Sequence, residues 1–273
     1  MGRATQDKWR VFVDTGGTFT DGLAVSPAGK RFKTKILSGD EAPLQAIRQL
    51  TGTSEKEPLP PVQMRLGTTR GTNALLEEKG AQVVFFVTEG FGDLLRIGDQ
   101  RRPDLFVLNV RNPSPLHAEV VEVPGRLDAQ GNEIKPLRPE QVKDAATRLV
   151  TKGRCVAAVM LLHSYQNSSH ELAIKDVLLK CGFEYVACSA QLAPFIKAVP
   201  RAETTVVDAY LGPLMTEYLD GVSEALSGGE LLVMTSAGGL VSRGGYRPKD
   251  SLLSGPAAGV VGAAAVGKRA ELE

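Results

Sequence analysis

The residues best suited to chemistry lie near the amino terminus, where Asp14 to Asp21 combine carboxylates, hydroxyls and two glycines. Apolar, β-prone runs flank Thr15–Thr18, which predicts a β-hairpin whose turn has Gly16 or Gly17 at positive φ. A turn without side chains exposes consecutive N–H groups, which can form an anion-binding nest. Hydroxyls add donors, and a carboxylate at the rim suits Mg²⁺, usually through water. The segment therefore indicates a site for the phosphates of a nucleotide with their metal.

On this hypothesis Asp14 is the catalytic, metal-facing carboxylate. The predicted nucleotide-binding residues are Thr15, Gly16, Gly17, Thr18, Thr20 and Asp21. An ordinary Gly-Gly hairpin turn is the alternative, because a motif this short has a real false-positive risk. The segment is not a Walker A loop, since no Gly-Lys-Ser/Thr follows it. It is not a dinucleotide-binding fingerprint either, since a strand and not a helix comes next.

A second polar group lies between Met64 and Gly80, where a short strand runs into a loop rich in hydroxyls. A helix follows, and Gly80 is expected to end it. The N-terminus of a helix is a natural site for an anion or a carbonyl group. The candidate substrate-binding residues are Gly67, Thr68, Thr69, Thr72 and Asn73. The alternative is that Thr72 or Asn73 only caps the helix.

Two further groups carry polar side chains. Arg101 and Arg102 belong to the basic stretch 98–106. They are candidates for holding a carboxylate or phosphate of the substrate, with a solvated loop as the alternative. His163 and His170 follow an apolar strand, at the end where open α/β sheets place ligands. Their residue type leaves a structural and a catalytic role open.

The elements that must position these groups begin with a meander. Three β-prone runs predict strands at residues 10–14, 19–25 and 31–37. Asp40 to Leu50 then predicts a helix, because its apolar positions follow helical spacing.

The rest of the chain alternates apolar strands with helices. The runs 83–87 and 155–162 predict buried strands, and 139–152 predicts a helix between them. This order indicates an α/β architecture with parallel strand pairing. Residues 202–226 predict a long helix that Gly212-Pro213 kinks or breaks. A last helix of very small residues is expected to start at Gly255-Pro256.

Length and composition limit the function classes. The chain has 273 residues and a net charge of +1, which allows one large domain or two smaller ones and argues against nucleic acid as partner. No apolar run reaches membrane-spanning length, and residues 1–8 lack the apolar core of a signal peptide. The sequence predicts a cytoplasmic protein. Its cysteines, Cys155, Cys181 and Cys188, are expected to be buried free thiols.

Several of these segments, in this order, resemble motifs of the hydantoinase A / 5-oxoprolinase family. They are residues 14–21, 65–77, 98–106, 204–213 and 254–262. The first also resembles the first phosphate loop of the actin, sugar-kinase and heat-shock ATPase superfamily. The resemblance implies a ribonuclease-H-like mixed sheet, with the first lobe present and the second incomplete. It implies an N-terminal domain over 9–200 and the start of the hydantoinase A domain over 201–273.

The resemblance also implies a reaction that uses ATP and Mg²⁺. ATP would phosphorylate the amide oxygen of 5-oxoproline or a hydantoin, making the ring carbon electrophilic to water. Arg102–Phe106 looks more like the 5-oxoprolinase branch. The implied partner is a second subunit or C-terminal domain of the hydantoinase B type. The alternatives are a subunit of an ATP-dependent ketone carboxylase, or a non-catalytic nucleotide-binding or assembly module that needs a partner chain.

One departure from the family concerns length. Its members are much longer, and they carry a second Asp-x-Gly-Gly-Thr loop that opens the second lobe. That string occurs once in this chain, at residues 14–18. On the resemblance the chain is therefore expected to be an N-terminal fragment that is inactive alone and binds ATP weakly.

Overall fold

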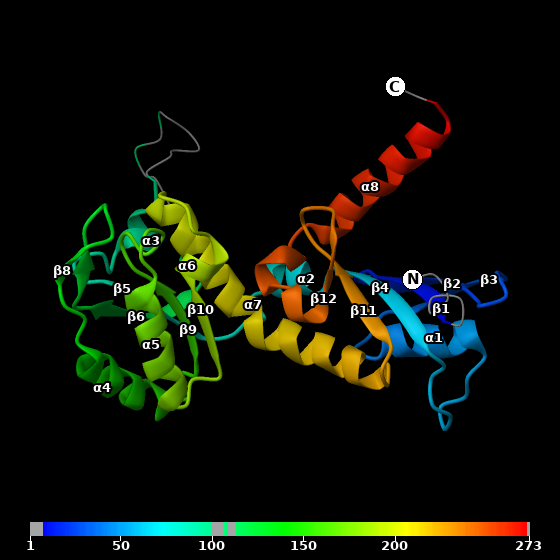
Figure 1. The fold of residues 1–273 in the computed structure, drawn as a ribbon, viewed down its shortest axis with the longest axis horizontal. Coiled ribbons are helices and arrows are strands. Elements are labelled where there is room, and N and C mark those ends of the chain that lie inside the picture. The colour runs from blue at the N-terminus through cyan, green and yellow to red at the C-terminus, as the bar shows by residue number, and fades with distance from the viewer. Residues whose placement is uncertain (1–7, 100–105, 107, 109–112, 272–273) are drawn as a thin grey trace. The chain divides into compact units, whose positions relative to one another are not determined.

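The computed structural model describes residues 8–99, 106, 108 and 113–271. The chain divides into two compact units, one made of residues 1–79 and 214–273 and the other of residues 80–213. Along the chain the second unit is thus inserted into the first. Figure 1 shows their helices and strands by label.

The described part of the first unit contains a six-stranded mixed sheet in the order β12-β11-β4-β1-β2-β3. Its strands are β1 (Trp9–Thr15), β2 (Phe19–Val25), β3 (Arg31–Leu37), β4 (Val62–Thr68), β11 (Glu230–Met234) and β12 (Leu240–Ser242). The first three form the antiparallel meander that the sequence predicts. β1 and β4 pair in parallel, as do β4 and β11. Their carboxyl ends therefore share one edge of the sheet, where open α/β sheets place ligands.

Residues of β1 and β4 alternate between two faces of this sheet. The buried face carries Val11, Val13, Thr15, Met64, Leu66 and Thr68. Helix α1 (Ala42–Thr51) packs on this face against Gly22 of β2, where an added Cβ would lie 3.0 Å from Leu50 Cδ1. The predicted helix after the meander is confirmed, and its apolar stripe faces the sheet as expected.

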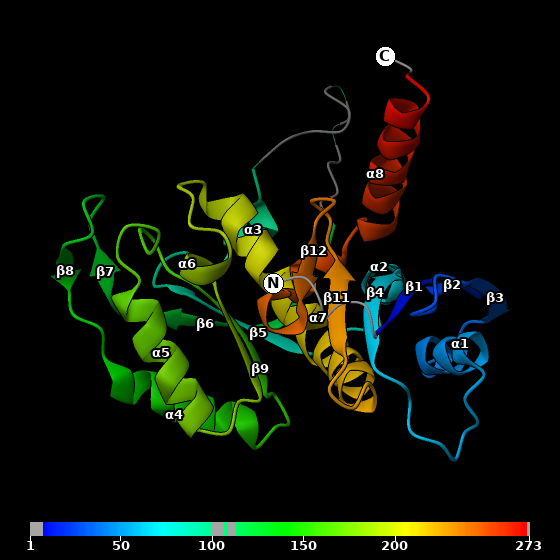
Figure 2. The same cartoon turned by 45° about the vertical axis from the view of Figure 1, so that its right-hand side comes forward.

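The opposite face of the sheet is more open. It carries Phe12 and Asp14 of β1, both exposed. Helix α8 (Ser254–Arg269) starts beside β4 and then projects away from the sheet in both views (Figures 1 and 2). Within α8 only Ser254 is buried, so its valines are largely exposed. The helix of small residues is confirmed, and it leaves apolar surface uncovered in the described part of this unit.

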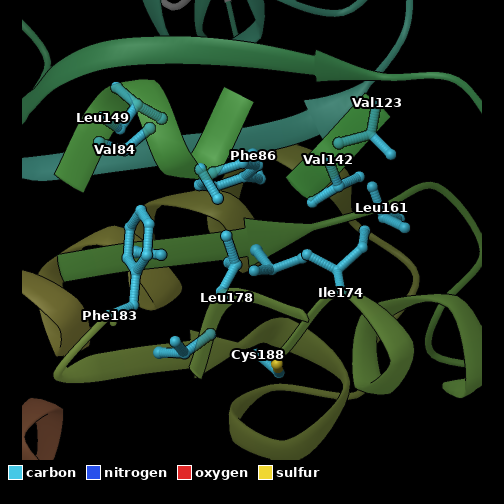
Figure 3. Packing of buried hydrophobic residues seen from close by; sticks show 14 residues of the cluster. Val84, Phe86, Val123, Val142, Leu149, Leu161, Ile174, Leu178, Phe183 and Cys188 are labelled. Atoms are coloured by element: carbon cyan, nitrogen blue, oxygen red, sulfur yellow. The ribbon is translucent and has the colours of Figure 1, made fainter. Parts of the chain in front are cut away.

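The described part of the second unit holds a four-stranded parallel sheet in the order β10-β9-β5-β6. Its strands are β5 (Val83–Thr88), β6 (His117–Val123), β9 (Val156–Met160) and β10 (Tyr185–Cys188). Helices α4 (Pro139–Val150) and α5 (Ser169–Lys180) pack on it. Figure 3 shows the core that these helices form with the sheet. The rings of Phe86 and Phe183 pack there edge to face, with their centroids 6.1 Å apart. The prediction of buried parallel strands is confirmed.

The remaining elements are short, apart from α7. They are α2 (Arg70–Leu76), α3 (Leu94–Ile97), β7 (Arg126–Leu127), β8 (Glu133–Lys135), α6 (Ser189–Leu192) and two 3-10 turns, Arg243–Gly245 and Pro248–Ser251. Helix α7 (Ala198–Ala225) runs through Pro213, so it does not break there, and a kink at Gly212-Pro213 stays a prediction. None of the helices in the described part of the chain has both the length and the apolar composition that a membrane span requires.

Gly80 does not end a helix, because α2 already stops at Leu76. An added Cβ at Gly80 would lie 2.0 Å from the ring of Tyr210. Gly212 is similar, since its Cβ would lie 2.6 Å from the Tyr185 ring. Both glycines therefore allow a tyrosine ring to pack against the backbone, a reason that the sequence pattern does not reveal.

All three cysteines are free, and Cys188 at the end of β10 is buried while the other two are half-buried. Burial, with the nearby Glu171 carboxylate, raises the pKa of the Cys188 thiol to about 12. Because the thiolate is the reactive form, iodoacetamide at neutral pH should label Cys155 and Cys181 well before Cys188. Mass spectrometry of a labelling time course checks this, with a urea-unfolded sample as control. Equal rates for all three in the folded chain would contradict it.

Candidate functional site

The Asp14–Asp21 segment forms the predicted hairpin. Thr15 pairs with Thr20, and Gly16 N–H donates to Phe19 O at 3.0 Å. Neither Gly16 nor Gly17 has a positive φ, so that part of the prediction is wrong. An added Cβ at Gly16 would lie 3.1 Å from Phe19 O. The glycine is needed because the turn closes tightly on itself, not because its φ is left-handed.

The turn presents unpaired donors. The N–H groups of Gly17 and Thr18 donate to no other described residue. Ser38, the residue after β3, braces the turn, since its hydroxyl donates to Gly16 O at 2.8 Å and lies 3.0 Å from Thr20 Oγ1. Thr20 is fully buried, so its hydroxyl shapes the turn, and a nucleotide contact from it stays a prediction. Two adjacent free N–H groups on a braced turn are suited to bind an anion.

The start of α2 lies against this turn. Thr69 N–H and Oγ1 donate to Thr15 O at 3.0 and 3.4 Å. Asn73 Nδ2 donates to Thr69 Oγ1 at 3.3 Å and lies 3.5 Å from the position of a Cβ on Gly17. The structure thus brings the two predicted polar segments together.

A cavity of about 300 Å³, here called the turn pocket, opens between these segments. The predicted residues that line it are Thr15, Gly16, Gly17, Thr68, Thr69 and Asn73. Sequence reasoning missed Ser38, Asp40, Arg70 and Tyr218, which line it as well. Its size is at the lower end for small-molecule sites.

Asp14 lies on the other face of the sheet from Thr15, because side chains alternate along a strand. It lines a second cavity, of about 1000 Å³, together with Gly67, Asp21, Arg65 and Val261 of α8. An added Cβ at Gly67 would lie 2.9 Å from Asp14 Oδ1. The glycine therefore leaves room for the carboxylate, and the candidate site has donors on one face and an acid on the other.

The two carboxylates of this segment differ in their surroundings. Asp21 accepts from Lys35 Nζ with both oxygens at 2.9 Å, whereas Asp14 has no hydrogen bond or ion pair with another described residue. In the described residues no cluster of three or more His, Cys, Asp or Glu side chains could hold a metal. A cation at Asp14 would thus have one protein carboxylate and complete its shell with water and phosphate oxygens. Mg²⁺ commonly binds in this way, so Asp14 fits it.

The capping interpretation of Thr72 and Asn73 is wrong. Both lie inside α2, whose N-cap residue is Thr69 with no side-chain capping bond. Thr72 Oγ1 instead accepts from Leu253 N–H at 3.4 Å, and Ser254 Oγ donates to Thr68 O at 3.2 Å. The start of α8 is thereby fastened to the loop that lines the turn pocket. Arg101 and Arg102 lie outside the described residues.

The histidines belong to the second unit. His170 is buried, and its Nε2 lies 2.6 Å from Glu133 Oε2, which ties α5 to β8. His163 has a φ of 60°, a strained value for a residue with a side chain. The contacts of His170 are those of a structural residue.

Comparisons with known proteins agree with these motifs. Residues 10–182 match the family model for the hydantoinase/oxoprolinase N-terminal region, and residues 201–273 match that for hydantoinase/oxoprolinase. The chain is 39% identical to 5-oxoprolinase 1 of Arabidopsis thaliana, over 96% of this chain and 24% of that protein.

Two solved structures share the fold. The nucleotide-free structure of acetone carboxylase matches with a TM-score of 0.83 and 26% identity, over 96% of this chain and 41% of that one. The ATP-dependent caprolactamase from Pseudomonas jessenii matches with a TM-score of 0.74 and 27% identity, over 91% and 39%. The chain thus spans well under half the length of each of these relatives. With family models that match most of its residues, the chain belongs to the hydantoinase/oxoprolinase family.

Proposed function

We propose that the chain is the N-terminal portion of an ATP-dependent enzyme that opens a cyclic amide, and that the 15–18 turn holds the phosphates. The observation that carries this is the pair of free N–H groups at Gly17 and Thr18 on a braced turn. The turn follows the end of β1, where Asp14 has no partner among the described residues. The names of the relatives, 5-oxoprolinase and ATP-dependent caprolactamase, support the reaction class. The order β3-β2-β1-β4-β11 supports a ribonuclease-H-like lobe of the actin/sugar-kinase superfamily.

In this reaction the amide oxygen takes the γ-phosphoryl group, and ADP leaves. Water then adds to the activated ring carbon, the C–N bond breaks, and a second water releases phosphate. The N–H groups of Gly17 and Thr18 would bind phosphate oxygens, and Asp14 would hold Mg²⁺ through water. When bound, the metal neutralises charge on the polyphosphate. Asn73 keeps one amide N–H as a donor for the substrate, and its bond to Thr69 Oγ1 holds the amide in position.

The finer assignments remain proposals. The substrate residues also include Gly67, Thr68, Thr72, Arg101 and Arg102. The partner is a subunit or domain of the hydantoinase B type, which would account for the greater length of the relatives. The domain division near residue 200 and the cytoplasmic location stay predictions. Ketone carboxylation is a second candidate reaction, favoured by the 0.83 TM-score to acetone carboxylase.

A phosphate-release assay tests this function. The longest form that the gene encodes, with ATP and Mg²⁺, should release phosphate faster with 5-oxoproline, a hydantoin or caprolactam. Stimulation only by a ketone with bicarbonate would instead identify a carboxylase. No stimulation by any of them would overturn both.

The chain alone should bind ATP weakly and release no phosphate above background. One glycine turn supplies only part of the donors for a polyphosphate, and each charge-assisted hydrogen bond that is missing costs about 1.5–3 kcal/mol. Calorimetric titration with ATP and Mg²⁺ measures this. Micromolar binding with substrate-stimulated phosphate release would show that the chain is a complete enzyme.

A further inference from the structure

We propose that Arg70 is the oxyanion-binding residue of the turn pocket, and that Asp40 occupies its guanidinium until a carboxylate or phosphate of the ligand replaces it. This inference rests on the proposed function. It concerns one contact inside the same pocket, between Arg70 at the start of α2 and the segment that follows β3.

The guanidinium of Arg70 is held in a fixed orientation. Its carbon lies over the Tyr218 ring, 4.8 Å from the centroid. Its Nη1 pairs with Asp40 Oδ1, and its Nε is buried without a partner in the described structure. Stacking on an aromatic face orients a planar guanidinium for recognition of an oxyanion. Arg70 is thus preorganised, although its charge is already paired.

Asp40 is a weak competitor for this cation. Its side chain is 82% exposed, whereas that of Arg70 is 32% exposed. Exposed ion pairs contribute little, because water screens them and the side chain loses rotamer freedom. An oxyanion in the pocket can therefore take the place of Asp40 at small cost. Glu77 and Lys79, which also line the pocket, form an ion pair with each other, with Lys79 Nζ 2.6 Å from Glu77 Oε2.

Two buried hydroxyls in the same pocket lack a hydrogen bond of normal geometry. Tyr218 is 7% exposed and Thr15 is 8% exposed, and neither Tyr218 Oη nor Thr15 Oγ1 has a hydrogen bond of normal geometry in the described structure, although the Thr15 and Thr68 hydroxyls lie near enough to Tyr218 to offset part of the rise in its pKa. Burial raises the pKa of the Tyr218 hydroxyl, so it stays a neutral donor at physiological pH. Buried polar groups are normally satisfied, and groups that are not call for an explanation. A ligand oxyanion beside Arg70 supplies acceptors for both.

Titrations of this chain followed by NMR of its arginine side chains test the proposal. The probes are tripolyphosphate, 5-oxoproline and its neutral ring analogue 2-pyrrolidinone. The variants are Asp40→Asn, Arg70→Gln and Arg70→Lys. Asp220→Asn is the matched control, because Asp220 forms a similar ion pair in the same unit, with Arg243 Nε at 2.7 Å. Chemical-shift dispersion shows that each variant is folded.

Asp40→Asn should tighten anion binding about two- to fivefold, since the competing pair is removed. Arg70→Gln should weaken it at least about tenfold, and Arg70→Lys should recover only part of the loss. Asp220→Asn and 2-pyrrolidinone should show neither effect. A response limited to 5-oxoproline assigns the subsite to a substrate carboxylate, and one limited to tripolyphosphate assigns it to the nucleotide.

Two other results overturn the inference. One is that Asp40→Asn and Arg70→Gln change the affinity for the anion no more than the control Asp220→Asn does. The other is no shift of the Arg70 resonance with either anion. In both cases the proposed function survives if the longest encoded form still releases phosphate in response to a cyclic amide. If that form shows no such activity, the proposed function fails separately.

Discussion

Replacing Asp14 by asparagine should lower substrate-stimulated phosphate release by the longest encoded form about a hundredfold or more, by analogy with the loss of other electrostatic groups at active sites. Asparagine keeps the shape that fits over Gly67 but removes the charge that attracts the metal. Asp14 is exposed and has no partner among the described residues, so no structural contact is lost. The melting temperature should therefore stay unchanged.

The measurement is phosphate release as a function of Mg²⁺ concentration, together with thermal unfolding. Asp14→Asn should also need more Mg²⁺ to reach half of its own maximal rate. Asp220→Asn removes a carboxylate from the same unit and should change neither the maximal rate nor the Mg²⁺ concentration that gives half of it. A wild-type rate for Asp14→Asn would exclude Asp14 from the metal role.

The sequence predicts the parts of this site that depend on residues close together in the chain, and it does not predict contacts between residues far apart in the chain. Strands β1, β2 and β3 follow from local β-propensity and the turn residues between them, and the structure confirms them. The separation of Asp14 and Thr15 onto opposite faces was also readable, because alternation is a property of any strand. It was not drawn from the sequence, so the acid and the donors were expected in one cluster.

The contacts around Arg70 could not be read in this way. Tyr218 lies far along the chain from Arg70, and the pairing of Arg70 with Asp40 depends on how α2 follows β4. Neither residue stands in a pattern that differs from an ordinary helix or loop. The glycines were predicted correctly as special positions but for the wrong reason. A side chain is excluded at Gly16 because Phe19 O lies close to it, and at Gly80 because the Tyr210 ring does. A pattern of glycines predicts a turn better than it predicts the reason for it.

The largest effect on stability is expected in the second unit, at the carboxyl end of β9. Glu171 and Arg201 are 0% and 1% exposed there, although both side chains are ionisable. Glu171 Oε1 accepts from Leu161 N–H at 2.9 Å, and Arg201 Nη2 donates to Leu161 O at 2.8 Å. The two side chains thus bind the N–H and C=O groups of one residue. Removing either leaves buried polar groups without partners.

Further bonds complete this network. Glu171 also accepts from Ser189 Oγ at 2.6 Å and Ala190 N–H at 2.8 Å, and Arg201 donates to Ser164 Oγ at 2.6 Å. These bonds link the ends of β9 and β10 to α5 and α7. The Glu171 charge also opposes the lowering of the Arg201 pKa by burial, so the two charges stabilise each other.

Arg201→Met should therefore destabilise the second unit by about 3–5 kcal/mol, the cost of leaving a buried charge without its partner. Hydrogen exchange of the β5 and β9 amides measures this, because it reports on the second unit even if the two units unfold separately.

Arg154→Met is the matched control. Its pair with Glu119 is partly exposed, at 3.5 Å, and its loss should cost about 1 kcal/mol or less. The double variant Arg201→Met with Glu171→Gln should be less destabilised than the sum of the single variants, because the uncompensated charge is gone. A cost for Arg201→Met no larger than that of Arg154→Met would show that the buried network does not stabilise this unit.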